Sequence, residues 1–455
     1  MQEVFSSFRD KSGFVFQTEG VFYRNVDNTY KEQYDFLMQS GLYEALVKKH
    51  WLIEHEEVKI EKYISDTVYK IIRPQQIDFI SYPYSWSFSM LKDAALLTLR
   101  ILKVALEHGM ILKDASAYNI QFLGCQPVFI DTLSFEIYKE GKPWQAYGQF
   151  CRHFLAPLAL MSQVDISLNK LLITHLDGIP IPLASKLLPF KTRFNLGLYL
   201  HLHLHAKTQT AYQDKKIDTA KNKVSKKTIE NLAENLTTTI TALKYVPKGT
   251  EWSEYYNKDV GDTYLDNKKT IIKGFLNQIQ PKKVLDLGAN DGTFSRLASE
   301  FAPNIYSFDI DPACVEHNYL SLKKEKNKNI IPLLVDATNP EPSIGWDNEE
   351  RPRLWDRVKP DTIMALALIH HLCISNNLPF SYLAQFFASH CEYLIIEWVP
   401  KEDEKVQRLL QNREDIFDDY TIDTFRTNFE KYYEIIETVK VLPTSRILFL
   451  MKTRT

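Results

Sequence analysis

The stretch Val284-Leu285-Asp286-Leu287-Gly288-Ala289-Asn290-Asp291-Gly292 contains a short apolar run, an acidic residue near the end of that run, and two glycines. The residues that follow, 293–298, have the apolar spacing of a helix. The stretch therefore predicts a strand, a tight turn and a helix. Its glycines would allow a ligand to approach the backbone at the helix N-terminus.

A second, mainly apolar run at residues 305–308 is followed directly by Asp309. In a doubly wound α/β fold, a carboxylate at the end of the second strand accepts hydrogen bonds from a ribose diol. We therefore expect Asp309 to hold the ribose of an adenosine cofactor.

The spacing of the glycines distinguishes between adenosine cofactors. A dinucleotide site needs Gly-x-Gly-x-x-Gly, because the middle glycine leaves room for the pyrophosphate. Here Asn290 replaces the middle glycine, and Ser295 lies where a third glycine could stand. The turn fits a smaller ligand better and leaves backbone amides for an amino-acid carboxylate. A NAD site and an ordinary turn without a ligand are the alternatives.

At these residues the chain resembles the class I S-adenosylmethionine (SAM) methyltransferases, whose first motif is an acidic residue followed by a glycine-rich turn. The resemblance implies a C-terminal, Rossmann-like, seven-stranded α/β domain with SAM as its cofactor and no metal. The first motif would flank the methionine part of SAM, Asp309 would bind the ribose hydroxyls, and the acidic residue in 334–337 would lie beside the adenine. The residues so assigned to the cofactor are Asp286, Gly288, Asn290, Gly292, Asp309 and Asp336.

The acceptor side of such a site lies at the carboxyl ends of the fourth and fifth strands. The sulfonium methyl is already activated, so the protein must align the acceptor and, for a hydroxyl, remove its proton. His370 and His371 follow the predicted fourth strand, and Glu397 ends the fifth. These three are the candidate catalytic residues, and one of them would be the general base. In the alternative interpretation the histidines only cap the strand and line the cofactor pocket.

Composition restricts the class of protein. The chain has 455 residues, 45% hydrophobic and 25% charged, as is typical of globular proteins. A formal net charge of -2 gives no general attraction to nucleic acid or to membranes, and neither is expected as a partner. The five cysteines are scattered, which favours reduced thiols. The charged N-terminal residues and the lack of a long apolar run predict a cytoplasmic protein without a signal peptide.

The chain divides by composition into three regions. Residues 1–206 are mixed and aromatic-rich, and we expect an α+β domain there. Residues 207–250 are polar and lysine-rich, which indicates a solvated helical connector, because no aromatic residues alternate with the lysines. Residues 251–455 form the predicted SAM domain. It closes with two extended runs, 434–441 and 447–451, which in the methyltransferase family form an antiparallel hairpin.

The N-terminal region carries a second pattern. Residues 91–108 predict an amphipathic helix, and Asp114, Asn119 and Asp131 follow it with the spacing of a protein-kinase-like catalytic loop and metal aspartate. In such a site Asp114 would accept the hydroxyl proton, and the other two would hold magnesium. The glycines nearby are isolated, and Arg24, or its rival Lys70, stands in for the phosphate-binding lysine. A degenerate kinase-like domain that only binds substrate and an unrelated α+β domain are the alternatives.

The stretch Leu200-His201-Leu202-His203-Leu204-His205 allows two interpretations. As a strand it would place three imidazoles on one face, which suits zinc. As a helix it would align only His201 and His205.

Taken whole, the chain resembles a bacterial family of nodulation-protein, or NoeA-like, methyltransferases. The segments that carry this resemblance are 87–95, 112–119, 130–136, 365–372 and 397–403. It implies a SAM-dependent methyltransferase with an unidentified acceptor, for which we expect a small molecule or a carbohydrate hydroxyl. The alternatives are a bifunctional protein with a phosphotransferase N-terminal half and a non-catalytic SAM-binding scaffold.

Overall fold

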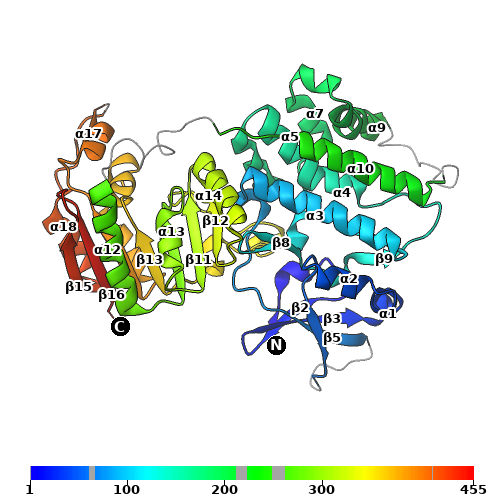
Figure 1. The fold of residues 1–455 in the computed structure, drawn as a ribbon, viewed down its shortest axis with the longest axis horizontal. Coiled ribbons are helices and arrows are strands. Elements are labelled where there is room, and N and C mark those ends of the chain that lie inside the picture. Colours follow the sequence, from blue (N-terminus) through cyan, green and yellow to red (C-terminus); the bar gives the residue numbers. More distant parts are fainter. Residues whose placement is uncertain (1, 61–66, 212–222, 248–261, 412, 455) are drawn as a thin grey trace. The chain divides into compact units, whose positions relative to one another are not determined.

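The structure is a computed structural model that describes residues 2–60, 67–211, 223–247, 262–411 and 413–454. The chain forms two compact units. Unit 1 comprises Met1–Val246 together with Ser343–Pro352, and unit 2 comprises Pro247–Pro342 and Arg353–Thr455 (Figure 1).

Unit 1 begins with a five-stranded antiparallel sheet in the order β1-β2-β3-β5-β4. Two helices stand between β3 and β4 in the sequence. The bounds of these elements are β1 (Gln2–Glu3), β2 (Val15–Thr18), β3 (Val21–Asp27), α1 (Lys31–Gln39), α2 (Leu42–Lys48), β4 (His55–Val58) and β5 (Val68–Pro74).

The rest of unit 1 is mostly helical and is built around α3 (Phe88–Glu107). The Ser87 hydroxyl accepts a hydrogen bond from Met90 N at the start of α3, and Gly109 adopts a left-handed φ of 75° after its end. The strands that follow are β6 (Met110–Leu112), β7 (Ile120–Leu123), β8 (Gln126–Phe129) and β9 (Phe135–Ile137). The remaining helices are α4 (Tyr147–Phe150), α5 (Ala156–Gln163), α6 (Leu171–Thr174), α7 (Ile181–Leu187), α8 (Leu196–Leu198), α9 (His205–Ala211) and α10 (Lys226–Ala242).

Helix α10 differs from the solvated connector that we predicted for 207–250. It packs against α3, and Ile229, Ala233, Leu236 and Ile240 are buried along one face. These apolar residues recur every three or four positions, so the polar composition of the segment belongs to the opposite face of an amphipathic helix. Residues 212–222 and 248–250 of the predicted connector lie outside the described residues.

The histidine run forms the π-helix η10 (Tyr199–Leu204) and the start of α9, so the strand interpretation is wrong. The His201 ring nitrogens lie 2.8 Å from the Tyr147 hydroxyl and 2.7 Å from Asn235 Oδ1. Those of His203 lie 2.9 Å from Ser185 Oγ and 2.8 Å from Thr192 Oγ1. Hydrogen bonds to protein groups therefore engage both rings.

A short segment from the C-terminal half of the sequence belongs to unit 1. Within Ser343–Pro352, Glu350 is buried and accepts two hydrogen bonds of 2.9 Å from the Arg9 guanidinium. The neighbouring Arg351 guanidinium lies 4.4 Å from the centre of the Tyr118 ring. These contacts join the segment to the N-terminal residues and to the loop that carries Asn119.

Unit 2 contains a seven-stranded sheet in the order β12-β11-β10-β13-β14-β16-β15. The first five strands are parallel, while β16 pairs antiparallel with both β14 and β15. The strands are β10 (Lys283–Leu287), β11 (Asn304–Asp309), β12 (Ile330–Leu334), β13 (Thr362–Ala365), β14 (Tyr393–Trp398), β15 (Tyr433–Lys440) and β16 (Ile447–Thr453). The predicted seven-stranded α/β fold and its closing hairpin are confirmed.

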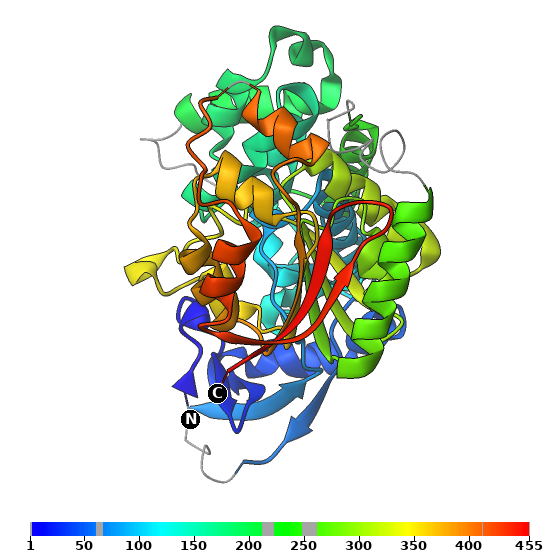
Figure 2. The same cartoon turned by 90° about the vertical axis from the view of Figure 1, so that its left-hand side faces the viewer.

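Helices lie on both faces of this sheet; Figure 2 shows α12 and α18 on opposite sides of it. The helices of unit 2 are α12 (Asp262–Ile279), α13 (Thr293–Ala298), α14 (Pro312–Glu325), α15 (Leu354–Arg357), α16 (Phe380–Ala388), α17 (Glu404–Leu410) and α18 (Ile422–Phe429). The central strands are buried over nearly their whole length, as expected for parallel strands covered on both faces. This arrangement places the carboxyl ends of β10 to β14 along one edge.

Candidate functional site

The loop after β10 has a backbone that few side chains tolerate. Gly288, Asn290 and Gly292 adopt φ values of 78°, 52° and 79°, in the left-handed region that favours glycine and asparagine. A Cβ at Gly292 would lie 2.6 Å from Cγ of Asn318, so only glycine fits there without a shift. The amides of Gly288 and Ala289 both donate to the Phe308 carbonyl at 2.9 Å, which fixes the loop to the end of β11.

Beneath this loop lies a buried polar network around Asp286. The Ser295 hydroxyl lies 2.6 Å from the Asp286 carboxylate and 2.8 Å from the Ser307 hydroxyl. The Asn318 amide donates to Ser307 at 2.9 Å. Burial raises the pKa of Asp286 to about 7, although the Ser295 hydrogen bond and the charge of Lys268 act in the opposite direction. The Asp286 side chain is thus bonded into the protein interior.

Asp309 ends β11 and closes the loop from the other side. Its two carboxylate oxygens accept hydrogen bonds from the amides of Asn290, at 2.7 Å, and Asp311, at 2.8 Å. Burial raises the pKa of this carboxyl to about 6, against the opposing effect of these amides. The Ile310 amide also donates to this carboxylate, which still has a lone pair that can accept a hydrogen bond from a hydroxyl group.

Asp336 follows β12, the next strand of the sheet. One of its oxygens accepts hydrogen bonds from the amide and the hydroxyl of Thr338, at 2.8 and 2.7 Å. Because β10, β11 and β12 run parallel, the structure brings Asp286, Asp309 and Asp336 to the carboxyl edge of the sheet. The three carboxylates therefore line the edge where open α/β sheets bind ligands.

His370 lies in the turn after β13 and is buried with 0% of its surface exposed. Among the described residues neither ring nitrogen has a hydrogen-bond partner. Its ring centre lies 4.1 Å from that of His371. Burial, together with the charges of Arg446 and Lys268 and the neighbouring His371, holds the pKa of His370 well below its usual value. The imidazole is therefore neutral and has unused hydrogen-bonding capacity.

The turn that carries the histidines also packs against the glycine loop. A Cβ at Gly288 would lie 3.2 Å from Cδ1 of Leu368. The preceding residue, Ala367, adopts a φ of 50°, which is strained for an alanine. The structure thus brings the fourth-strand turn and the first-motif loop into direct contact, as the predicted site requires.

Glu397 is also fully buried, but its carboxylate has several partners. It accepts hydrogen bonds from the Tyr264 hydroxyl at 2.7 Å and the Lys268 ammonium at 2.6 Å, and the Arg446 guanidinium lies at 3.8 Å. Burial alone would raise the pKa of Glu397, but the charges of Lys268 and Arg446 outweigh it, and the net shift is downward. Arg446 also pairs with Asp403 at 2.8 Å. Sequence reasoning missed Lys268 and Arg446, because no local motif marks them.

In unit 1 the structure brings the kinase-like residues together. Asn119 donates to the Ser134 hydroxyl at 3.2 Å, and that hydroxyl donates in turn to Asp131. Burial raises the pKa of Asp114, and the nearby charge of Asp131 contributes to the shift. The Arg24 guanidinium lies 3.0 Å from Asp131 and also pairs with Asp10. An arginine therefore neutralises the carboxylate that would hold magnesium in a kinase.

Lys70, the rival of Arg24, does not join this cluster. It lies on β5 near the surface, where its ammonium pairs with Glu57 at 2.5 Å.

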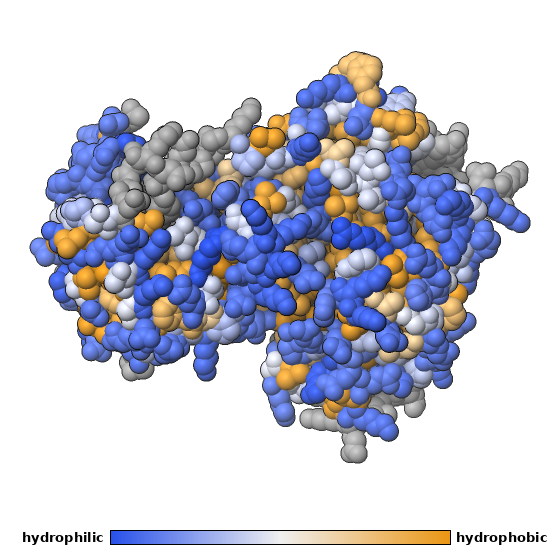
Figure 3. Space-filling model, in the orientation of Figure 1, coloured by the Kyte–Doolittle hydropathy of each residue, from blue (hydrophilic) through white to orange (hydrophobic). Residues whose placement is uncertain are grey.

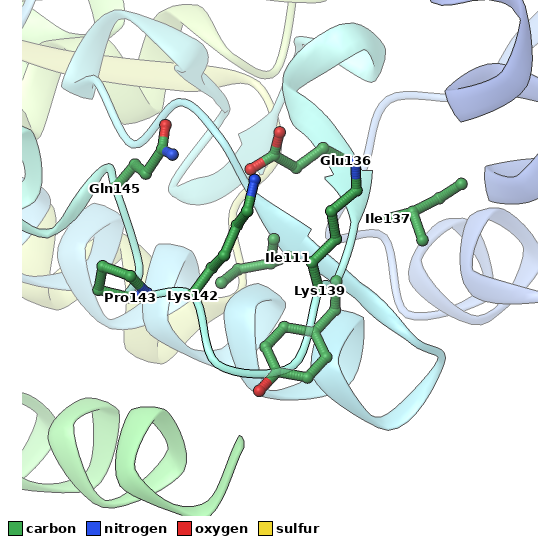
Figure 4. A pocket seen from close by; sticks show the side chains of 8 residues that line it. Ile111, Glu136, Ile137, Lys139, Lys142, Pro143 and Gln145 are labelled. Carbon is green, nitrogen blue, oxygen red and sulfur yellow. The ribbon is translucent and has the colours of Figure 1, made fainter. Parts of the chain in front are cut away.

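A small pocket in unit 1 is not lined by any of the predicted site residues (Figure 4). It is lined by Ile111, Glu136, Ile137, Tyr138, Lys139, Lys142, Pro143 and Gln145.

Over the described ranges, the histidine, cysteine and carboxylate side chains form no group of three or more that could hold a metal ion. Within the same ranges no helix is both long enough and apolar enough to cross a membrane.

Comparison with known proteins agrees with this geometry. The family described as a methyltransferase domain matches residues 256–426. Over its whole length the chain is similar to the nodulation protein NoeA of Rhizobium meliloti (strain 1021). The two are 33% identical, and the match covers 98% of this chain and 95% of that protein.

Solved structures of methyltransferases are similar to part of the chain. The N-methyltransferase NodS from Bradyrhizobium japonicum WM9, in complex with S-adenosyl-L-homocysteine, is 11% identical with a TM-score of 0.32, and the match covers 46% of this chain and 94% of NodS. The magnesium protoporphyrin IX methyltransferase ChlM from Synechocystis PCC 6803, with bound SAM, is 16% identical with a TM-score of 0.30, and the match covers 45% of this chain and 89% of ChlM.

The methyltransferase domain covers the sheet edge described above, and the match to NoeA extends over both units. The cofactor expected from the sequence is therefore confirmed as SAM. The chain belongs to the NoeA family of nodulation proteins and is a SAM-dependent methyltransferase.

Proposed function

We propose that this methyltransferase acts on a hydroxyl group of a small molecule or carbohydrate, and that His370 removes the proton of that hydroxyl. The observation that carries the proposal is the state of His370. It is a fully buried imidazole at the carboxyl end of β13, with no hydrogen-bond partner for either nitrogen among the described residues. A buried polar group without a partner is costly, and such groups are characteristic of binding and catalytic sites.

The residues at the edges of β10 to β12 fit the cofactor. In the left-handed loop, Gly288 and Gly292 carry no side chain that could come between a ligand and the backbone. The amides of residues 288–293 all donate to protein groups, so the expectation that amides remain for an amino-acid carboxylate is not met. We propose that the methionine part lies against the backbone of this loop and that Asp309 accepts hydrogen bonds from the ribose hydroxyls. Asp286 would support the loop from below through Ser295. Asp336 would lie beside the adenine. Bound SAM supplies a methyl group that needs no further activation.

The electrostatic surroundings keep His370 unprotonated when the acceptor arrives, because burial together with the nearby Arg446 and Lys268 disfavours the charged imidazolium. The same surroundings make it a weak base. We propose that it takes the proton late, when the acceptor oxygen is already bonding to the methyl group and its proton has become strongly acidic. His371, whose pKa burial and the charges of Arg446 and Lys405 lower to about 4, stays neutral as well. We propose that His371 packs against the His370 ring and sets its orientation.

Glu397 has a different proposed role. Its carboxylate is ionised and shared among Tyr264, Lys268 and Arg446, so little of it remains to take a proton from an acceptor. We propose that Glu397 positions the two cations that keep His370 neutral. It would act through these neighbours and not as the base.

Unit 1 raises a second candidate function, phosphotransfer at Asp114, Asn119 and Asp131. It is favoured by one observation, the Ser134 hydroxyl that links Asn119 to Asp131. The Arg24 guanidinium on Asp131 acts against it, because magnesium and arginine would compete for the same carboxylate. We therefore propose that unit 1 recruits or shapes the acceptor for the methyltransferase and transfers no phosphate.

The first prediction concerns Asp309 and pH. Because the pKa of Asp309 is raised to about 6, the carboxyl is ionised at pH 7.5 and largely protonated at pH 5.5. We expect SAM affinity, measured by calorimetry, to fall about threefold or more between these pH values. Asp309→Ala should lower the affinity at least about tenfold at pH 7.5. Glu300→Ala, which removes an exposed carboxylate of the same unit, should leave SAM affinity unchanged.

Asp286 also titrates near neutrality. An unchanged pH dependence in Asp309→Asn would assign the effect to Asp286 instead.

The second prediction concerns the base. His370→Gln should lower kcat for methyl transfer to a carbohydrate hydroxyl by about 10²- to 10⁴-fold, and it should leave SAM affinity within about twofold. Transfer of a radiolabelled methyl group to a panel of sugars and small alcohols measures this. The matched control is His317→Gln on the exposed face of α14. A rate in His370→Gln equal to that of the wild type would exclude His370 as the base.

The third prediction separates positioning from proton transfer at Glu397. Glu397→Ala leaves the Lys268 ammonium buried without its main partner and should destabilise unit 2 by about 3–5 kcal/mol. The double variant Lys268→Met/Glu397→Leu should recover most of this loss in thermal unfolding. Glu392→Ala removes an exposed ion pair with Lys452 and should change stability by less than about 1 kcal/mol. If the double variant is no more stable than Glu397→Ala, the unpaired Lys268 ammonium is not the cause of the stability lost in Glu397→Ala.

The fourth prediction tests phosphotransfer. Calorimetric titration of ATP with magnesium into the wild type should show no magnesium-dependent binding. The reason is that the Arg24 guanidinium is already paired with the Asp131 carboxylate, which magnesium would need. Magnesium-dependent binding that is lost in Asp131→Ala, and kept in the control Asp78→Ala, would establish the second candidate instead.

A further inference from the structure

An exposed apolar patch covers one end of the helical part of unit 1. It lies on α7, the 3-10 helix η9 (Phe190–Phe194), α8 and η10. Phe190, Phe194 and Leu196 are 67%, 80% and 68% exposed, far more than large apolar side chains elsewhere on these helices. We call this set the Phe190 patch; its members are Leu187, Phe190, Phe194, Leu196, Leu200 and Leu204.

The helices that carry the patch are packed against the interior of unit 1 on their other face. The same helices bury Ile181, Ala184, Leu198 and Leu202 in unit 1, so their apolar residues point both inward and outward. The His203 ring joins three of these segments, because its nitrogens lie 2.9 Å from Ser185 on α7 and 2.8 Å from Thr192 on η9. The exposed side chains are therefore presented by a firmly connected surface.

The patch is internally packed, and the charged residues of the segment that carries it are all basic. The Phe190 and Phe194 rings contact each other edge to face with centres 5.6 Å apart, and the Arg193 guanidinium lies 5.3 Å from the Phe190 ring centre. From residue 178 to residue 213 the sequence contains no aspartate or glutamate. The cations in this range are Lys186, Lys191, Arg193 and Lys207. Figure 3 shows hydrophobic atoms at the upper edge of the molecule, near the place of α7 and α9 in Figure 1.

We propose that the Phe190 patch attaches the protein to the surface of an anionic lipid membrane. The apolar side chains would enter the boundary between headgroups and acyl chains, and the basic residues would contact the lipid phosphates. Contiguous exposed apolar surface is uncommon on proteins that stay in water, and aromatic and aliphatic side chains bordered by lysine and arginine are typical of helices that lie in a membrane interface. A patch without carboxylates is complementary to anionic lipids. Attachment of this kind requires no membrane-spanning helix and does not depend on the proposed acceptor.

Flotation of the full-length protein with vesicles tests the proposal. Wild type should bind vesicles of phosphatidylcholine with phosphatidylglycerol at least about tenfold more strongly than vesicles of phosphatidylcholine alone, and salt should weaken the binding. Phe190→Ser/Phe194→Ser should lower binding to the anionic vesicles at least about tenfold. Lys191→Glu/Arg193→Glu should do the same, since each basic residue near an anionic surface contributes about 1 kcal/mol.

Two control variants match these changes elsewhere on the surface. Tyr382→Ser removes a side chain that is 69% exposed in unit 2, and Lys324→Glu/Lys328→Glu reverses two exposed charges there. Both should bind vesicles like the wild type.

Three outcomes would overturn the proposal. The first is a wild type that does not float with either vesicle, or patch variants that bind like the controls. The second is a change of molecular mass in solution in Phe190→Ser/Phe194→Ser, which would identify the patch as an interface between copies of the chain. The third is a lower unfolding temperature in that variant, which would show that another part of the chain covers the patch.

Discussion

The buried Asp286 carboxylate imposes the constraint on which the structure of the proposed SAM site depends. A carboxylate in an apolar interior is costly unless hydrogen bonds satisfy it. The Ser295 hydroxyl offsets part of that cost here, and burial still raises the pKa of Asp286. Through Ser307 and Asn318 the same network connects β10, α13, β11 and α14. Because Asn318 fills the space beside Gly292, the network also excludes a side chain at that point of the loop. The shape of the loop is thus determined from below, before any ligand arrives.

Two fully buried ionisable groups near the carboxyl ends of β13 and β14, His370 and Glu397, have opposite surroundings. The Glu397 carboxylate is surrounded by donors from α12 and from the residue before β16, while His370 has no bonded partner among the described residues. In a low dielectric, both situations are energetically expensive unless something balances them. The excess positive charge around Glu397 balances its own burial and at the same time disfavours an imidazolium nearby. One arrangement of charges therefore serves both groups.

The parts of the site that the sequence predicted are those encoded by local patterns. The strand, turn and helix around Gly288 are contiguous, and Asp309 and Asp336 each follow a recognisable apolar strand. The parts that it missed depend on distant pairings. Lys268 looks like an ordinary solvated helix residue until β14 supplies Glu397, and Arg446 joins them only after the closing hairpin has formed.

Polar composition misled the sequence interpretation in the same way at α10. Lysines and threonines dominate the segment, but burial follows position on the helix, and four apolar positions suffice to pack it on α3. The histidine run was ambiguous because alternation suits a strand, while the surrounding segment folds as a helix. The net charge of the whole chain averages over residues 178–213, where every charged side chain is a lysine or an arginine.

The segment Ser343–Pro352 has a consequence for the way this protein can be divided. Although it stands between β12 and β13 in the sequence, its buried Glu350 is paired with Arg9 near the start of the chain. A fragment that begins after residue 246 would retain the glutamate and lose the arginine. A single cut between the two halves of the sequence therefore does not separate the two units, because it leaves ten residues of unit 1 on the methyltransferase fragment.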